Sequence, residues 1–135
     1  MDLPRARELL VQLGYNLPDM EVRRRYESIA SASDHALFVA TRDGVTVGLL
    51  HVYFRPALDK PPEVIVQALV VEETARGTGV GRRLMETAEL WAVERGCSCI
   101  ALTSHIARLD AHRFYQRLGY RIEATSHLMR KPLAG

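Results

Sequence analysis

Three glycines alternate with other residues in the stretch RGTGVG at positions 76–81, between a run typical of a strand and a run typical of a helix. A glycine-rich turn at the start of a helix leaves backbone N–H groups free, and another molecule can approach them without meeting a Cβ atom. The positive end of the helix dipole then favours negative charge. The stretch therefore predicts a backbone cradle for an anion, although a tight turn without a ligand has the same local pattern.

The spacing of the glycines narrows the kind of anion site. No Lys-Ser or Lys-Thr pair follows them, which excludes the phosphate loop of nucleoside triphosphatases. The dinucleotide-binding fingerprint needs two residues between its last two glycines, whereas one residue separates Gly79 from Gly81. What remains is the pattern Arg76-x-x-Gly79-x-Gly81, preceded by the apolar run 69–71.

Hydrophobic periodicity and turn residues predict the elements that must position this loop. A helix between strands 63–71 and 97–103 makes that pair parallel, whereas the turn 42–44 makes its flanking strands antiparallel. The expected architecture is one α/β domain over residues 1–135 with a mixed sheet. The predicted helices span 4–13, about 22–30, 80 to about 96 and 111–118, and the predicted strands span 36–40, 45–54, 63–71, 97–103, 120–123 and 127–131.

Composition limits the class of protein. The 135 residues are 47% hydrophobic and 25% charged with a net charge of +2, which is typical of a globular protein and too weakly basic to indicate nucleic acid. No apolar run approaches a membrane span and no signal peptide is recognisable, so we expect a cytoplasmic protein without a membrane partner. Cys97 and Cys99 are expected on one face of a strand as packing residues. No metal site is expected, because no second Cys/His pair accompanies them and the histidines show no ligand spacing.

Two motifs together resemble the GNAT superfamily of N-acetyltransferases. The pattern Arg76-x-x-Gly79-x-Gly81 resembles the family's coenzyme-A pyrophosphate loop, and DAHRFYQRLGY at 110–120 is similar to its second signature. The two lie about thirty residues apart with a helix and a strand between them, as in the family, and the resemblance covers at least residues 36–131. The stretch 102–115 is further similar to a subgroup that includes aminoalkylphosphonate acetyltransferases.

The resemblance implies a GNAT-like mixed sheet whose parallel central strands splay apart. Members of the family usually begin with a strand, whereas Met1-Asp2-Leu3-Pro4 leads almost directly into the first predicted helix. We therefore expect the sheet to lack its first strand and to leave the 36–40 strand with an edge that is bare or covered by a partner. An open edge and the closing hairpin also leave a homodimer open.

The resemblance also implies acetyl-CoA as cosubstrate. Backbone N–H groups from Arg76 to Gly81 would hold the pyrophosphate, while the side chain of Arg76 packs or faces solvent. Main-chain groups of Leu69 and Val71 would meet the pantetheine arm, and an N–H there would face the thioester oxygen, a contact worth about a hundredfold in rate. The implied cofactor-binding residues are Leu69, Val70, Val71, Arg76, Gly77, Thr78, Gly79, Val80, Gly81, Arg82 and Tyr115.

Tyr115 matches the tyrosine that the family places near the departing sulfur, where a phenol can donate its proton to the thiolate; packing against the pantetheine is the alternative. The general base is less clear, because the glutamate of many relatives is replaced by Ile65. Glu63 lies on the same strand face and could act through water or be a surface charge. His105, just beyond a parallel strand, could be a base or an ordinary loop residue.

The leading interpretation is an acetyl-CoA-dependent N-acetyltransferase that acts on a small primary amine by direct attack on the thioester. The acceptor would bind among the first two helices, the loop 55–62 and the closing hairpin. A peptide or protein acetyltransferase, modifying a lysine or an N-terminus, is the second interpretation. A CoA-binding module without turnover is the third, and the replacement of the family's glutamate by Ile65 supports it.

Overall fold

The computed structural model describes residues 1–104 and 109–134, and the chain forms two compact units that divide after Thr103. The first unit contains a four-stranded sheet in the order β1-β2-β3-β4, antiparallel in its first two pairs and parallel between β3 and β4. Its elements are α1 (Leu3–Leu13), α2 (Asp19–Ala30), β1 (His35–Arg42), β2 (Val45–Arg55), β3 (Glu63–Val71), the 3-10 helix η1 (Glu73–Ala75), α3 (Val80–Glu94) and β4 (Ile100–Leu102).

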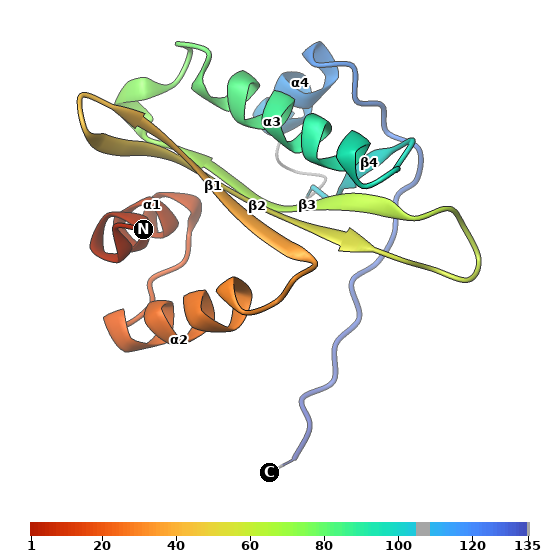
Figure 1. Ribbon diagram of the computed structural model, residues 1–135, viewed down its shortest axis with the longest axis horizontal. Helices are drawn as coiled ribbons and strands as arrows, with labels where there is room; N and C mark the ends of the chain where they lie inside the picture. Colours follow the sequence, from red (N-terminus) through yellow and green to blue (C-terminus); the bar gives the residue numbers. More distant parts are fainter. Residues whose placement is uncertain (105–108, 135) are drawn as a thin grey trace. The chain divides into compact units, whose positions relative to one another are not determined.

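In the first unit, α1 and α2 lie on one side of the sheet and α3 lies on the other (Figure 1). On the α1 side, Leu49 of β2 packs with Ala6 and Leu9. On the α3 side, a Cβ atom at Gly48 would lie 2.8 Å from Leu84 Cδ1 and 3.0 Å from Val80 Cγ1. The bare backbone of β2 therefore lets the first turn of α3 pack directly on the sheet.

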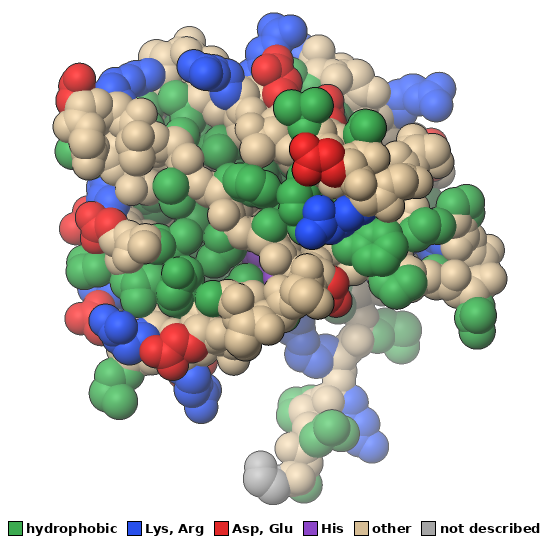
Figure 2. All heavy atoms as spheres, in the orientation of Figure 1, with side chains coloured by type: hydrophobic (Ala, Val, Ile, Leu, Met, Phe, Trp, Pro, Cys, Tyr) green, Lys and Arg blue, Asp and Glu red, His purple; other side chains and the backbone are tan. Residues whose placement is uncertain are grey.

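Each helix of the first unit turns an apolar stripe to the sheet. α3 buries one face along its length, whereas Leu90 and Val93 stay exposed. Figure 2 shows hydrophobic side chains gathered between the layers, with charged side chains on the outside of the helices. The arginines at 23–25 are exposed, and Arg24 and Arg25 both pair with Glu21. The buried residues of α3 are Leu84, Met85, Ala88, Trp91 and Ala92.

The strand predicted over 97–103 is shorter than expected, since β4 covers three residues, Ile100–Leu102. Val64 aligns with Ile100, so residues 97 and 98 would align with Pro61 and Pro62, which cannot donate to a ladder. The two cysteines therefore precede the strand and do not share a face: Cys97 is buried and Cys99 is exposed. The expectation for this pair was wrong.

The closing hairpin predicted over 120–131 is also wrong, because residues 120–134 form neither helix nor strand in the structure. The side chains from Arg121 to Ala134 are exposed, including the apolar Leu128 and Met129. A two-stranded hairpin is marginal without a further strand or helix against its apolar face. Alternating apolar residues are thus insufficient evidence for a strand here.

The expected open edge is confirmed. β1 lies at one end of the sheet order with β2 as its partner, and no strand precedes α1 within residues 1–104. No helix in the described part of the chain is long and apolar enough to cross a membrane.

The second unit contains α4 (Leu109–Arg117), close to the helix predicted over 111–118. Within this unit the ring of Tyr115 makes edge contacts with the rings of Phe114 and Tyr120, with centroids 5.1 Å apart for Phe114–Tyr115 and 5.8 Å apart for Tyr115–Tyr120.

Candidate functional site

A fork opens in the sheet where β3 loses its parallel neighbour. β4 pairs with β3 from Val64 to Val66, and the ladder between β3 and β2 shifts register just beyond that point. The N–H of Glu72 donates to the carbonyl of Val47 on β2 at 2.7 Å. Because peptide groups alternate along a strand, Leu69 and Val71 direct their N–H and C=O groups away from β2, into the fork. The pairing of β3 with β4 thus ends while β3 continues to Val71, as the predicted splay requires.

The glycine loop joins this fork to α3. Gly77 and Gly79 have φ angles of 77° and 91°, and an added Cβ atom would meet nothing within 4 Å at either position. These glycines are required by backbone conformation and not by lack of space. α3 begins at Val80, so its unpaired N–H groups and the positive end of its dipole lie at the loop. The geometry is that of a backbone anion cradle.

Hydrogen bonds from side chains hold the glycine loop in place. The hydroxyl of Thr78 donates to the carbonyl of Ala75 and accepts a hydrogen bond from Arg42 Nη2 at 3.0 Å. Arg76 folds back, and its Nε donates to the carbonyl of Val71 at 3.2 Å. The Arg76 side chain thus connects the loop to the end of β3, which leaves the N–H of Val71 as the group that this contact does not use.

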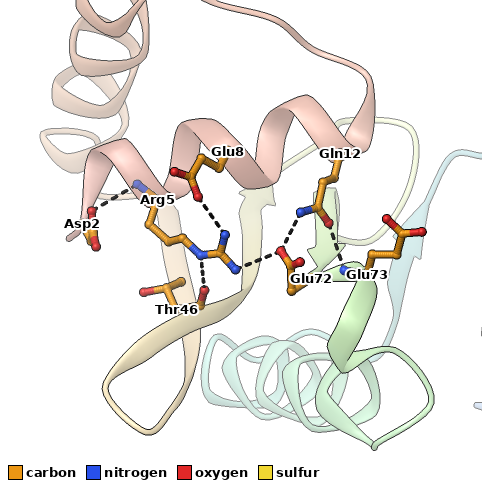
Figure 3. Close-up of polar contacts among 7 residues, drawn as sticks. All are labelled: Asp2, Arg5, Glu8, Gln12, Thr46, Glu72 and Glu73. Atoms are coloured by element: carbon orange, nitrogen blue, oxygen red, sulfur yellow. Dashed lines mark hydrogen bonds and ion pairs between the residues drawn. The ribbon is translucent and has the colours of Figure 1, made fainter.

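A polar network ties α1 to the segment that leads into the loop (Figure 3). Arg5 donates through Nε to the carbonyl of Thr46 at 2.8 Å and through Nη2 to Glu72 at 2.9 Å. Gln12 donates to the same Glu72 carboxylate at 2.5 Å and accepts a bond from the N–H of Glu73 at 2.9 Å. The bonds from Gln12 and Arg5 hold the pKa of the Glu72 carboxyl below its ordinary value. The entry to the loop is thereby anchored to α1.

A cluster of three rings, His35, His51 and Tyr53, lies on β1 and β2. His35 Nδ1 and His51 Nε2 are 2.8 Å apart, and the ring of His35 stacks on Tyr53 with centroids 5.1 Å apart. His51 and Tyr53 follow Leu49 at two-residue intervals, so this histidine cluster lies on the sheet face that α1 packs against. Burial, followed by the charge of His35, lowers the pKa of His51 from 6.5 to about 4. His51 is therefore neutral at neutral pH.

An ion pair continues the same face of β2. Arg55 Nη2 donates to Glu63 Oε1 at 2.5 Å across the β2–β3 ladder. Arg55 Nε is buried and has no hydrogen-bond partner in the described part of the chain. Ile65, at the position where many relatives are expected to carry an acid, pairs with Tyr53 next to the histidine cluster. The ion pair therefore lies at the start of β3, whereas the glycine loop lies beyond the end of β3.

The predicted catalytic residues fall in different places. Glu63 is the first residue of β3 and is ion-paired with Arg55. Tyr115 lies on α4 in the second unit, and His105 lies outside the described residues. Sequence reasoning did not single out His35 and His51 as functional. No local signal marks them, because only the register of the hairpin brings together these two histidines, sixteen residues apart.

Several known proteins to which this chain is similar are named as acetyltransferases. The profile of the Acetyltransferase (GNAT) family matches residues 4–120. An uncharacterized N-acetyltransferase of Bacillus subtilis is 31% identical over 111 residues, which are 82% of this chain and 77% of that protein. The aminoalkylphosphonate N-acetyltransferase of Salmonella typhimurium is 36% identical over 84 residues, which are 62% of this chain and 54% of that protein. A solved structure of the aminoglycoside N-acetyltransferase AAC(6')-Iy in complex with CoA has a TM-score of 0.88 and 26% identity, and the match covers 97% of this chain and 89% of that one.

Proposed function

We propose that this chain, which belongs to the Acetyltransferase (GNAT) family, uses acetyl-CoA to acetylate a small primary amine. The observation that carries the proposal is the continuity between the anion cradle at the start of α3 and the fork between β3 and β4. If the cradle binds the pyrophosphate of coenzyme A, the position of the pyrophosphate fixes where the pantetheine arm begins. The peptide groups of Leu69 and the N–H of Val71 point away from β2 along that path.

In this proposal the N–H groups from Arg76 to Gly81 bind the pyrophosphate, with Arg82 in the same first turn of α3. The peptide groups of Leu69 and Val71 bind the pantetheine arm, with Val70 between them turned to β2. A fork N–H then faces the thioester oxygen and stabilises the negative charge that develops there. Such a donor contributes about a hundredfold or more to the rate.

The chemical step is direct transfer. The neutral amine nitrogen forms a bond to the acetyl carbon, the bond between that carbon and sulfur breaks, and its electron pair leaves with the sulfur. The phenol of Tyr115 donates a proton to the departing thiolate. Glu63 and His105 stay candidates for the base. Glu63 Oε1 would have to release its bond from Arg55 before it could receive a proton.

Two features support a small amine as the acceptor. Two of the named relatives acetylate aminoalkylphosphonates and aminoglycosides, which are both small molecules with primary amines. The unpaired Arg55 Nε also offers a donor suited to an acidic or hydroxyl group on such a substrate.

The test is a thiol-release assay with acetyl-CoA and a panel of polyamines, aminophosphonates, aminoglycosides and lysine peptides. Turnover with members of the first three groups is the expected result. Turnover with peptides alone would replace the proposal by a protein acetyltransferase. Tight binding of acetyl-CoA by calorimetry, with no turnover of any amine, would leave a binding module.

A further inference from the structure

The histidine cluster lies one strand away from the fork. His51 pairs with Ala68 of β3, immediately beside the register shift and two residues beyond Val66, the last residue of β3 that pairs with β4. Adjacent strands are about 4.8 Å apart, so an acyl group in the fork would have His51 within one or two side-chain lengths. The His51 ring lies on the face opposite α3, on which α1 and α2 pack and where the acceptor is expected to bind.

The short contact between the two imidazoles constrains their protons. A nitrogen-to-nitrogen distance of 2.8 Å requires one N–H donor and one lone pair, so the two nitrogens cannot both be protonated. His35 Nε2 lies 4.0 Å from Asp34 Oδ1, and the His35 side chain is 29% exposed. His51 Nδ1 has no hydrogen-bond partner in residues 1–103 of the structure. The pair therefore runs from an unpartnered nitrogen beside the fork to a partly exposed nitrogen near a carboxylate.

We propose that His51 and His35 form the path by which the acceptor amine loses its proton, with His51 as the acceptor and His35 as the outlet to solvent. This inference rests on the proposed function, since it needs an amine at the fork. It assigns a role to two residues for which sequence spacing gave none.

The proton leaves the amine in three transfers. When the amine nitrogen bonds to the acetyl carbon it becomes cationic, and it gives one proton to His51 Nδ1. The Nε2 proton of His51 passes to His35 Nδ1 along their hydrogen bond. His35 then releases its Nε2 proton to water beside Asp34, and both rings return to neutral as the tautomers exchange back.

The low basicity of His51 suits a relay. A cationic nitrogen bonded to an acyl carbon is a far stronger acid than a free ammonium group, so a weakly basic imidazole can accept its proton. The same weak basicity prevents the proton from staying on His51. The other charged groups beside the cluster are Asp34, Arg55 and Glu63; no described side chain of α1 or α2 forms a hydrogen bond or ion pair with either ring.

The experiment compares His51→Gln and His35→Gln with His127→Gln, which removes an exposed histidine from the second unit. For each variant we would measure kcat against pH with an amine that the wild type acetylates, and the Kd for acetyl-CoA by calorimetry. His51→Gln should lower kcat about a hundredfold, as expected for loss of a proton acceptor, with an unchanged Kd. His35→Gln should lower kcat about tenfold, and the control should match the wild type.

A second readout separates proton transfer from packing. In His51→Ala, added imidazole should restore part of the lost kcat, and the restored rate should increase with the fraction of unprotonated imidazole. If His51→Gln and His51→Ala keep the wild-type kcat and pH profile, or if imidazole restores nothing, the inference is wrong while the proposed function stands. A wild type that binds acetyl-CoA and acetylates no amine would overturn the proposed function first. If His51→Gln does not fold, His35→Gln decides: an unchanged kcat in that variant overturns the relay.

Discussion

The cradle and the histidine cluster use opposite parts of the residue for their chemistry. The cradle presents backbone N–H groups, and its glycines contribute conformation and no side chain. The histidine cluster presents imidazole nitrogens, and its backbone is extended strand, with the register shift of the β2–β3 ladder beside His51. A site made of backbone is therefore damaged by adding atoms, whereas a site made of side chains is damaged by removing them.

The largest effect should come from adding a branched side chain to the cradle. Gly79→Val places a β-branched residue at a φ of 91°, a strain of about 1–3 kcal/mol that the loop relieves by changing shape. We expect the Kd for acetyl-CoA to rise roughly tenfold to a hundredfold, measured by calorimetry. Gly44→Val, at a φ of 78° in the β1–β2 turn and with equally open surroundings, is the matched control. Equal loss of affinity in both variants would mean that the loop holds no cofactor.

The second-largest effect should come from crowding the contact between β2 and the start of α3, on which the position of the cradle depends. Gly48→Ala crowds Val80 and Leu84 in the first turn of α3, and overpacking of this kind costs about 1–3 kcal/mol. Denaturant titration should show that loss of stability, and the Kd for acetyl-CoA should rise severalfold. With saturating acetyl-CoA, kcat should stay near the wild-type value, because the histidine cluster lies on the other face. Val45→Ala, at an exposed position of β2, should change neither quantity, and a kcat loss as large as the Kd effect would contradict the separation of the two regions.

The smallest effect concerns the histidine cluster without any ligand. An unfolded histidine takes up a proton near pH 6.5, whereas folded His51 resists protonation until the pH nears its pKa of about 4. Because the unfolded state binds more protons in this window, the free energy of unfolding should fall as the pH drops from 6.5 to 4. The His51 ring is partly exposed and therefore screened by solvent, so the fall should be about 1 kcal/mol rather than the full value of the shift. His51→Gln should lack this part of the pH slope in denaturant titrations, and His127→Gln should retain it.

The sequence predicts the cradle well because each of its residues answers a local requirement. A positive φ angle favours glycine at positions 77 and 79. The helical spacing of apolar residues predicts the helix that follows. The fork was predictable through the family resemblance alone. The prolines before Glu63 delay the start of β4, and the pairing of β4 with β3 ends at Val66, where the β2–β3 ladder shifts register.

The histidine cluster could not be predicted, because it depends on a register shift that leaves no mark in the sequence. Thr41 pairs with Thr46, but Ala40 pairs with Gly48, so one extra residue enters β2. Without that residue His35 would pair with Val52 and its ring would point to the opposite face from His51. The failed hairpin has a different cause: its apolar residues alternate, but the side chains at 121–134 stay exposed.

The carboxylate of Glu72 links α1 to the glycine loop. Arg5 and Gln12 hold it from α1, while its own backbone leads within a few residues to the glycine loop. A ligand that orders the loop should therefore also stabilise α1 against fraying. Because coupling between two sites is reciprocal, a change that stabilises α1 should in turn tighten the binding of that ligand. Occupancy by nucleotide should therefore slow amide exchange in a helix that the nucleotide never touches.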